Sequence, residues 1–380
     1  MTFDTSTWEE ISFGEIARSL TNAAKNPLSE NLVRYVGLEH IEPGNIHIKS
    51  WGNVADGTTF TRVFRKGHVL FGKRRAYQKK AAVAEFDGVC SGDILVLEAI
   101  EKSLSPELLP FIVQSDRFFD CAVKTSAGSL SPRTKFKDLA KFSLKLPPLD
   151  KQKRIADLLW SIDEVVESKI VLSRQLNGIY CSFLEEIHSE QRGKKKYKVK
   201  DICTINANNL SAKTDPNYRF KYLDIASIIA PNKIGELKEY SFEDAPSRAR
   251  RIVEQGNLVL SLVRPYQQSF VMVENEVHHL IASTGTAVLK AGDSIDTKYL
   301  FHSLFTKNFL SFCEQRMNGT NYPAITPSDL KQYEVYCPAL DEQRVFSKKL
   351  SAIIEIEEGL LKEVEILNGI NKQLINQIFG

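Results

Sequence analysis

Apolar residues recur with helical spacing in two long stretches of the chain, one after Asp150 and one after Asp341. In each stretch, eight of ten positions spaced alternately three and four residues apart are apolar. This spacing, sustained over about four heptads, is typical of a coiled-coil seam. The expected seam residues are Ile155, Leu159, Ile162, Val166, Leu176 and Phe183 in the first stretch and Phe346, Leu350, Ile353, Leu360, Leu367 and Leu374 in the second.

Each stretch predicts a helix of about 40 residues, which would be about 60 Å long at a rise of 1.5 Å per residue. Asp150 and Asp341 are expected to be the N-caps, because a carboxylate there accepts hydrogen bonds from free amides and favours the helix dipole. Two helices of equal length with matched seams favour an antiparallel pair. The alternative is two separate amphipathic helices, each packed on its own domain.

The region before each long helix contains short apolar runs bounded by Gly, Pro, Asn and Asp, which predict strands. In the first half these strands are expected at Val33–Leu38, Val69–Phe71 and Ile94–Leu97. An amphipathic helix is expected near Pro106–Phe119 and again near Thr297–Phe312. A last strand, at Phe142–Leu146 and at Tyr333–Cys337, ends at a proline before the long helix begins.

The two halves of the chain match each other in sequence 191 positions apart. Leu176-Asn177-Gly178-Ile179, for example, recurs as Leu367-Asn368-Gly369-Ile370. A period of this length is too long for a solenoid repeat and indicates a duplicated domain followed by a duplicated helix. A chain that carries one module twice is expected to read a target that itself has two parts.

The duplication predicts an α+β protein with two α/β domains and two long antiparallel helices that form a coiled coil. The expected boundaries are residues 1–149 for the first domain, 150–190 for the first helix, 191–196 for a linker, 197–340 for the second domain and 341–380 for the second helix.

The composition of the 380 residues, 43% hydrophobic and 26% charged, is ordinary for a folded soluble protein. Six cysteines without close pairing suggest neither a zinc site nor a disulfide framework, so a reducing cytoplasm is the expected location. The first residues do not resemble a signal peptide, and no apolar run approaches the roughly 18 residues of a membrane helix. A net charge of +3 is only weak evidence for binding to nucleic acid.

The distribution of charge is more informative, because residues 57–84 contain eight Lys or Arg and no acidic residue. Cationic side chains neutralise phosphates, arginine pairs with guanine and glutamine pairs with adenine. The DNA-binding candidates of this segment are Lys73, Arg74, Arg75, Tyr77, Gln78, Lys79 and Lys80, and Arg264, Tyr266, Gln267 and Gln268 occupy the matching positions of the second half. The alternatives are a solvated basic turn, or a role in folding with Tyr77 and Tyr266 packed in each core.

A second candidate is the loop over residues 126–137, with its counterpart over residues 318–327. Small residues let backbone amides approach a phosphate closely, and longer side chains could reach bases. The candidate residues are Ser129, Arg133 and Lys135 in the first half and Thr320, Asn321 and Tyr322 in the second. The alternative is an ordinary surface connection that makes no contacts.

Sequence signals for catalysis are missing. The chain has neither a G-x-x-x-x-G-K-[ST] phosphate loop nor a G-x-G-x-x-G fingerprint. Asp215-Pro216-Asn217-Tyr218 is only faintly similar to the motif of amino-methyltransferases and is expected to form a turn. His278-His279 has no other ligand at metal-binding spacing. We therefore expect no catalytic residue, no metal and no bound cofactor in this chain.

Two motifs carry a family resemblance, Pro147-Pro148-Leu149-Asp150-Lys151-Gln152 and Pro338-Ala339-Leu340-Asp341-Glu342-Gln343-Arg344. With the duplicated domains, they resemble the specificity subunit of type I restriction-modification systems over essentially the whole chain. Gly72-Lys73-Arg74-Arg75-Ala76-Tyr77-Gln78 also looks typical of one set of target recognition domains in that family. The second half departs from it with Val263-Arg264-Pro265, a difference that would let the two halves read different sequences.

The resemblance implies a bipartite target on double-stranded DNA, with two half-sites separated by a fixed spacer. The paired helices would act as a ruler, since about 60 Å of helix is comparable with the roughly 68 Å of two turns of B-DNA.

The resemblance also implies two DNA adenine methyltransferase subunits that dock on the helices and use S-adenosylmethionine. A restriction subunit that translocates DNA with ATP and Mg²⁺ can join them, and the complex would be a type I site-specific deoxyribonuclease and adenine-N6 DNA methyltransferase. The chain itself would be non-catalytic. The alternative class is a duplicated adaptor that binds proteins, which predicts no steep salt dependence of binding to duplex DNA.

Overall fold

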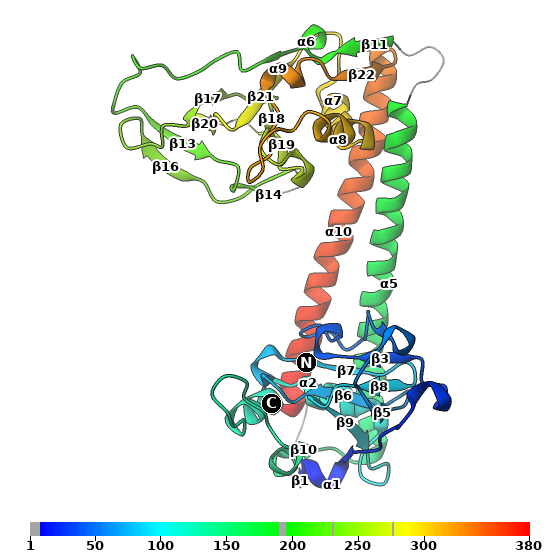
Figure 1. Ribbon diagram of the computed structural model, residues 1–380. Coiled ribbons are helices and arrows are strands. Elements are labelled where there is room, and N and C mark those ends of the chain that lie inside the picture. Colours follow the sequence, from blue (N-terminus) through cyan, green and yellow to red (C-terminus); the bar gives the residue numbers. More distant parts are fainter. Residues whose placement is uncertain (1–7, 190–194, 230–231, 276) are drawn as a thin grey trace. The chain divides into compact units, whose positions relative to one another are not determined.

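The computed structural model describes residues 8–189, 195–229, 232–275 and 277–380. The chain divides into two compact units, Met1–Ile170 with Leu361–Gly380, and Val171–Leu360. Each unit contains one globular domain and a part of both long helices, α5 (Leu149–His188) and α10 (Leu340–Phe379) (Figure 1). The expected fold class, two duplicated α/β domains with two long helices, is confirmed.

The first unit contains two four-stranded sheets and one strand pair. The first sheet has the order β2 (Ala17–Leu20), β9 (Ile94–Ala99), β6 (Val69–Gly72), β7 (Ala81–Val83), and all of its pairs are antiparallel. The second has the order β4 (Gly52–Asn53), β3 (Arg34–Val36), β8 (Gly88–Cys90), β5 (Arg62–Phe64), with β3 and β8 parallel. The strand pair joins β1 (Glu9–Ser12) to β10 (Ser143–Leu146), the strand that precedes α5.

The second unit repeats this topology. Its sheets have the orders β12 (Cys203–Ile205), β21 (Thr286–Ala291), β18 (Leu258–Ser261), β19 (Phe270–Met272) and β16 (Lys238–Ser241), β13 (Arg219–Leu223), β20 (Leu280–Ser283), β17 (Ala249–Val253). The parallel pair recurs between β13 and β20, and β11 (Lys195–Lys198) pairs with β22 (Glu334–Cys337). A small hairpin of β14 (Ile228–Ile229) and β15 (Lys233–Ile234) is added. The duplication therefore extends to strand order and strand direction.

One helix was expected before each of the two candidate loops, residues 126–137 and 318–327, but each region forms two helices. The first prediction is replaced by η5 (Pro106–Leu108), α2 (Leu109–Gln114) and α3 (Asp116–Lys124), and the second by α7 (Thr297–Ser303) and α8 (Lys307–Glu314). The break lies at Ser115 and at Thr306, each in an extended conformation as an N-cap. Their hydroxyl oxygens accept hydrogen bonds from the amides of Phe118, at 3.3 Å, and Phe309, at 3.2 Å. Apolar periodicity continues across the break, which is why the sequence pattern missed it.

The remaining helices are short. They are α1 (Phe13–Ile16), α4 (Phe136–Leu139), α6 (Val199–Ile202) and α9 (Pro327–Leu330), with 3-10 turns η1 (Pro27–Glu30), η2 (Leu38–His40), η3 (Val54–Asp56), η4 (Ala76–Gln78) and η6 (Pro265–Gln267). Of the expected linker, residues 191–194 lie outside the described residues, and Lys195 and Lys196 belong to β11 instead.

The prediction that Asp150 and Asp341 are the N-caps of the long helices was wrong. The long helices begin at Leu149 and Leu340, so Asp150 and Asp341 lie inside the first turn. A carboxylate in the first turn still interacts favourably with the helix dipole.

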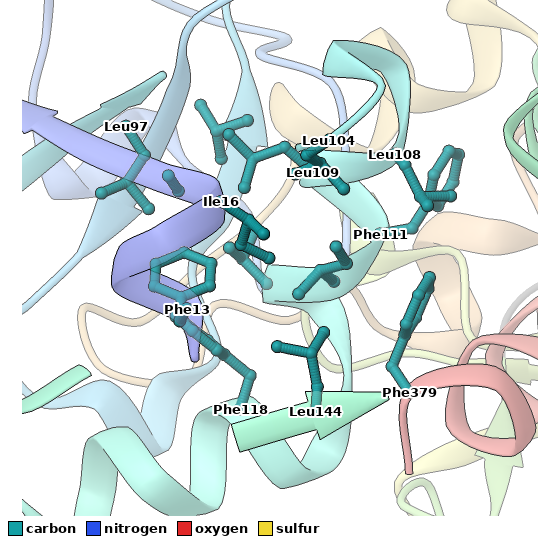
Figure 2. Close-up of a cluster of buried hydrophobic side chains, with 14 of the residues drawn as sticks. Phe13, Ile16, Leu97, Leu104, Leu108, Leu109, Phe111, Phe118, Leu144 and Phe379 are labelled. Atoms are coloured by element: carbon teal, nitrogen blue, oxygen red, sulfur yellow. The ribbon is translucent and has the colours of Figure 1, made fainter. Parts of the chain in front are cut away.

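The hydrophobic core of the first unit receives both long helices. Figure 2 shows Phe13 and Ile16 of α1 close to Phe118 of α3, and the rings of Phe13 and Phe118 have centroids 4.7 Å apart. The same cluster contains Ile155 and Leu159 of α5 and, from the end of α10, Ile375, Ile378 and Phe379. The core of the second unit likewise includes Leu184 and Ile187 of α5 and Leu350 of α10. Each domain therefore holds the beginning of one long helix and the end of the other.

The two long helices pack against each other in both units, which excludes the alternative of two helices that lie apart on their own domains. In the second unit, Ser173 donates to Glu357 at 3.0 Å and the rings of Phe183 and Phe346 are 6.0 Å apart, so the helices are antiparallel. In the first unit Lys169 forms an ion pair with Glu363. Among the twelve expected seam residues, Ile155, Leu159, Val166 and Leu350 are buried, and Ile162, Leu176, Phe183, Phe346, Ile353, Leu360, Leu367 and Leu374 are partly buried.

A buried glutamine attaches each long helix to its domain. In the first unit the side-chain oxygen of Gln152 accepts from the Ser105 amide at 3.0 Å. Its amide nitrogen donates to the carbonyl oxygens of Pro147, at 3.0 Å, and Ser103, at 3.3 Å. Glutamine suits this position because one side chain supplies both a donor and an acceptor.

Gln343 makes the same set of contacts in the second unit. Its side-chain oxygen accepts from the Asp296 amide at 2.9 Å, and its nitrogen donates to the carbonyl oxygens of Pro338, at 3.0 Å, and Ser294, at 3.4 Å. The glutamine of both duplicated motifs is therefore a structural residue that joins the last strand, the helix start and a domain loop.

We expect Gln152→Ala or Gln343→Ala to lower the free energy of unfolding by roughly 1–3 kcal/mol, because buried and partly buried backbone groups lose their glutamine partner. Chemical denaturation of the purified chain measures this. Lys151→Ala and Glu342→Ala are the matched controls, since these neighbours are exposed. Equal stability of the glutamine variants and the controls would contradict the role of the glutamines.

An ion pair centred on His47 also ties the first domain to α5. The Nε2 atom of His47 lies 2.6 Å from Oδ2 of Asp163, and its Nδ1 atom lies 2.6 Å from Oε1 of Glu85. The hydrogen bond to Asp163, opposed by partial burial and supported by Glu85, raises the pKa of His47 to about 9. Lys49 pairs with Glu167 one helical turn further along.

The raised pKa of His47 predicts a pH-dependent stability. Because the folded pKa is about 9 and the ordinary value is 6.5, the stabilisation is complete below pH 6.5 and is lost as the pH rises through 9. We expect His47→Ala to lower the free energy of unfolding by about 1–2 kcal/mol at pH 6, a value reduced by solvent screening. Urea denaturation at pH 6 and pH 10 should show the difference from wild type shrinking at the higher pH, and a constant difference would refute it.

Candidate nucleic-acid interface

The structure joins the two predicted recognition loops of each half into one surface. In the first unit the amide of Arg75 donates to the Pro132 carbonyl at 2.8 Å, and the amide of Thr134 donates to the Lys73 carbonyl at 3.0 Å. In the second unit Arg264 donates to Pro323 at 2.7 Å and Ile325 donates to Leu262 at 3.0 Å. The same backbone pairing therefore builds a continuous loop surface in both units.

Both surfaces contain the same unusual backbone turn. Arg75 and Lys79 flank the 3-10 turn η4 with φ angles of 53° and 52°, and Arg264 and Gln268 flank η6 with 48° and 52°. Left-handed backbone is unfavourable for residues other than glycine, and such strain persists only where the surrounding structure imposes it. Its presence at the same two positions of each turn marks this turn as a feature that both domains need.

Three tyrosines project from these turns and loops into solvent. Tyr77 is 57% exposed, Tyr266 is 46% exposed and Tyr322 is 71% exposed. The alternative in which Tyr77 and Tyr266 pack in the cores is therefore wrong, and the neighbouring Ala76 and Pro265 are the buried residues of each turn. Exposed rings of this kind can stack on a base or contact a phosphate.

Several basic residues of the first turn already have partners within the chain. Nζ of Lys79 lies 2.5 Å from Oδ1 of Asp116, and Nζ of Lys80 donates to the Leu38 carbonyl at 2.7 Å. Partial burial, followed by the nearby Arg62 charge, lowers the pKa of Lys73. The basic segment is thus held against the domain, and its DNA contacts stay predictions.

An acidic residue that the sequence patterns did not single out orients two of the arginines. Asp93 accepts from Nε of Arg133 at 2.7 Å and from Nη2 of Arg133 at 3.3 Å, and Nη1 of Arg74 lies 3.4 Å away. Arg133 and then Arg74 hold the pKa of Asp93 below its usual value. Asp93 lies before β9, distant in sequence from Arg133, so only the folded structure brings it to this surface.

The other predicted residues lie on the same loops. Ser129, Lys135, Gln267, Thr320 and Asn321 are exposed, and Gln78 and Gln268 are partly buried. The guanidinium of Arg264 lies 5.0 Å from the centre of the Tyr322 ring, and its Nη2 donates to the Asn321 carbonyl at 2.9 Å. The second surface is therefore built around an arginine and an aromatic ring, whereas the first is built around two arginines and an aspartate.

The described residues contain no group of three or more His, Cys, Asp or Glu side chains arranged to hold a metal ion. His279 instead accepts or donates through Nδ1 to the hydroxyl of Tyr218 at 2.7 Å. The six cysteines are free thiols, and burial raises the pKa of Cys90, Cys203, Cys313 and Cys337 to about 12. Within the described ranges, none of the helices has the length and apolar character needed to cross a membrane.

Comparison with known proteins gives consistent similarities. The family model described as type I restriction modification DNA specificity domain matches residues 5–175 and again residues 191–366. The EcoDI type I restriction enzyme specificity subunit of Escherichia coli is 26% identical over 175 residues, a match that covers 43% of this chain and 37% of that relative. The MjaVIII type I restriction enzyme specificity subunit of Methanocaldococcus jannaschii is 22% identical over 76% of this chain and 73% of its own length.

Solved structures share the fold. The S subunit of a type I restriction-modification system from M. genitalium has a TM-score of 0.62 and 13% identity, and the likeness covers 100% of this chain and 98% of that one. A chain from a structural study of complex assembly and conformational transition in the type I R-M system has a TM-score of 0.59 and 19% identity, with 98% of both chains covered.

Proposed function

This chain belongs to the type I restriction modification DNA specificity domain family, whose domain it carries twice, and we propose from this that each of its two loop surfaces reads one half of a bipartite, asymmetric DNA target. The observation that carries the proposal is the pair of equivalent loop surfaces, each with a strained turn and exposed tyrosine, on two domains of the same topology. Arginine, glutamine and tyrosine side chains on such loops suit contacts with phosphates and base edges.

The asymmetry of the target follows from the differences between the two surfaces. Both keep the arginine before the 3-10 turn and the tyrosine within it, Arg75 with Tyr77 and Arg264 with Tyr266. The neighbouring positions differ in charge and size, so the two surfaces offer different donors to a base pair. One chain would then bind two unlike half-sites in a fixed order.

In this proposal the helix pair sets the length of the spacer between the half-sites. Each helix has 40 residues and a length of about 60 Å. A continuous helix is stiff along its axis, and the antiparallel packing supports each helix by the other. The separation of the half-sites should therefore depend on the number of residues in both helices.

We expect a heptad inserted after Ile170 and a second one after Leu360 to lengthen the spacer by about three base pairs, because seven residues add about 10 Å and base pairs are about 3.4 Å apart. Methylation-sensitive sequencing of DNA from a host that carries the chain measures the target. The wild-type chain should give one bipartite sequence, and an insertion in only one helix should abolish methylation. An unchanged spacer in the double insertion would refute the ruler, and the absence of any bipartite target would refute the whole proposal.

We also propose that the helices dock two DNA adenine methyltransferase subunits. The supporting feature is the repeated tetrapeptide, of which Asn177-Gly178-Ile179 and Asn368-Gly369-Ile370 are exposed in their respective units. Ile179 is 56% exposed and Ile370 is 42% exposed. A Cβ atom at Gly178 or Gly369 would meet nothing within 4 Å, so no contact inside the chain requires either glycine.

The retention of these residues needs a cause outside the chain. Glycine in the middle of a helix costs about 1 kcal/mol relative to alanine, and asparagine is also a poor helix former. An exposed isoleucine beside a glycine offers an apolar contact together with close approach to the helix backbone. Two equal patches fit two copies of the same partner.

We expect Ile179→Asp or Ile370→Asp alone to leave one methyltransferase subunit per chain, and the double variant to leave none, because a charge desolvated in an apolar contact is costly. Native mass spectrometry of the reconstituted complex counts the subunits. The matched control is Val345→Asp, since Val345 is 52% exposed and Arg154 takes its place in the other copy. Two bound subunits in the double variant would contradict the docking site.

The chemistry of the complex would then reside in the partners. The methyltransferase subunits use S-adenosylmethionine, and methylation requires the target adenine to leave the base stack. A restriction subunit that consumes ATP with Mg²⁺ would make the assembly a type I site-specific deoxyribonuclease. Free thiols throughout the chain suit work in the cytoplasm. This chain would contribute specificity and spacing alone.

A further inference from the structure

The sharpest difference between the two loop surfaces lies at three structurally equivalent positions. The backbone of Arg74 pairs with that of Arg133 in an isolated antiparallel β-bridge, and the backbones of Val263 and Ala324 pair in the same way. The Lys73 amide donates to the Asp93 carbonyl at 3.0 Å, and the Leu262 amide donates to the Gly285 carbonyl, also at 3.0 Å. Arg74, Asp93 and Arg133 of the first domain are therefore replaced by Val263, Gly285 and Ala324 in the second.

In the first domain the three residues form one hydrogen-bonded cluster, which we call the arginine-aspartate cluster. The Asp93 carboxylate accepts hydrogen bonds from one edge of the Arg133 guanidinium, from Nε at 2.7 Å and from Nη2 at 3.3 Å. Nη2 of Arg74 donates to the Ser131 hydroxyl at 3.0 Å, while its Nη1 faces Asp93 at 3.4 Å. One carboxylate thus orients two guanidinium groups, and a net positive charge remains.

The geometry leaves the recognition edge of Arg133 available. A guanidinium has two edges that each offer two parallel donors, and Asp93 occupies the one that contains Nε. At the end edge, Nη1 with Nη2, the further contact found among the described residues, beyond the Nη2 contact with Asp93, is a long one of 3.4 Å from Nη1 to the Ser131 carbonyl. The Arg133 side chain is about half exposed, at 46%. Because the carboxylate has already fixed the rotamer, little conformational freedom is lost when the end edge binds a ligand.

A fixed pair of parallel donors matches guanine best among the bases. In the major groove guanine presents two neighbouring acceptors, O6 and N7, whereas adenine presents one acceptor with a donor and thymine one acceptor with a methyl group. A phosphate would also accept both donors, because arginine binds phosphate bidentately as well. A phosphate contact carries no sequence preference, so a measurement of base preference distinguishes the two.

The second domain lacks the arginine-aspartate cluster. Val263, Gly285 and Ala324 provide no charge, and an open hollow of about 820 Å³ beside Val263 is lined by Ile225, Ile228 and Tyr322 together with Arg248 and Arg264. The Cβ of a residue at Gly285 would lie 3.1 Å from Cδ1 of Ile225, a contact with the end of a flexible side chain.

We propose, on the basis of the proposed function, that Arg133 reads a guanine in the half-site of the first domain, that Asp93 is its positioning residue, and that the second domain has no equivalent contact. Arg133 thereby acquires a base and a half-site, and Asp93 becomes part of the recognition surface.

The test uses the full chain in complex with its methyltransferase subunits, isolated from the host through a tag on this chain. Binding to a duplex DNA library randomised at both half-sites measures base preference at every position. We expect Arg133→Ala to reduce the preference for one guanine roughly ten- to a hundredfold, the range of a bidentate contact, with no change in the other half-site. Asp93→Asn should weaken the same preference by a smaller factor, because the arginine remains but is no longer held.

Arg133→Lys separates base reading from phosphate binding, since lysine keeps the charge and loses the paired donors. We expect it to lose guanine preference while retaining overall affinity. The matched control is Tyr322→Ala on the second surface, which should leave the guanine preference intact. The triple variant Val263→Arg, Gly285→Asp, Ala324→Arg should introduce a guanine preference into the other half-site.

Each other outcome overturns the inference. Affinity that falls equally for all sequences would make Arg133 a phosphate contact, and preference lost equally at both half-sites would remove the assignment to the first domain. Full guanine preference in Arg133→Lys would exclude paired donors. If the wild-type complex selected no bipartite sequence at all, the proposed function would fail instead, a result visible before any variant is compared.

Discussion

The buried glutamine at the start of each long helix is the interaction on which the rest of the structure depends. Gln152 and Gln343 each bind three backbone groups, one from the last strand of the domain, one from a loop and one from the start of a helix. Both glutamine side chains are buried, and their hydrogen bonds to Pro147 and Pro338 are buried with them, so loss of the side chain leaves these carbonyl groups poorly satisfied. The direction in which a long helix leaves its domain is thereby fixed, and a recognition surface on that domain acquires a fixed orientation relative to the helix.

The duplication separates what a recognition domain must keep from what it can change. Strand order, the single parallel pair and the left-handed backbone at Arg75 and Arg264 are the same in both units. Neighbouring side chains differ, as Arg74 and Val263 do, although the tyrosine of the turn, Tyr77 or Tyr266, is the same. Backbone hydrogen bonds between the two loops hold the surface in shape without help from these side chains. Such an arrangement lets the contacts with a target vary while the fold stays constant, which is how loops on a rigid scaffold usually carry specificity.

Periodicity and internal repetition predicted the features that depend on local sequence, and missed those that depend on distant contacts. The long helices and their seams follow from spacing within each helix, and the duplicated domains follow from matching segments. The break at Ser115 was missed because the apolar pattern continues across it, although the helix itself is interrupted. Asp93 was missed because its partner Arg133 lies 40 positions away in sequence, on a different loop. The exposure of Tyr77 depends on a turn with left-handed backbone at both ends. The residues at those ends are arginine and lysine rather than glycine, so the sequence does not predict the turn.

The helix seam contains polar residues where a purely apolar one would be more stable. Lys169 pairs with Glu363 in the first unit, and Ser173 pairs with Glu357 in the second. Apolar side chains tolerate a shift of one heptad, because leucine and isoleucine pack acceptably against many neighbours. A shift would cost Lys169 its ion pair with the exposed Glu363 and Ser173 its hydrogen bond with Glu357, so the polar positions favour a single register. The proposed spacer-setting role needs one register more than it needs additional stability, since a slip of one heptad would change the spacing by about 10 Å.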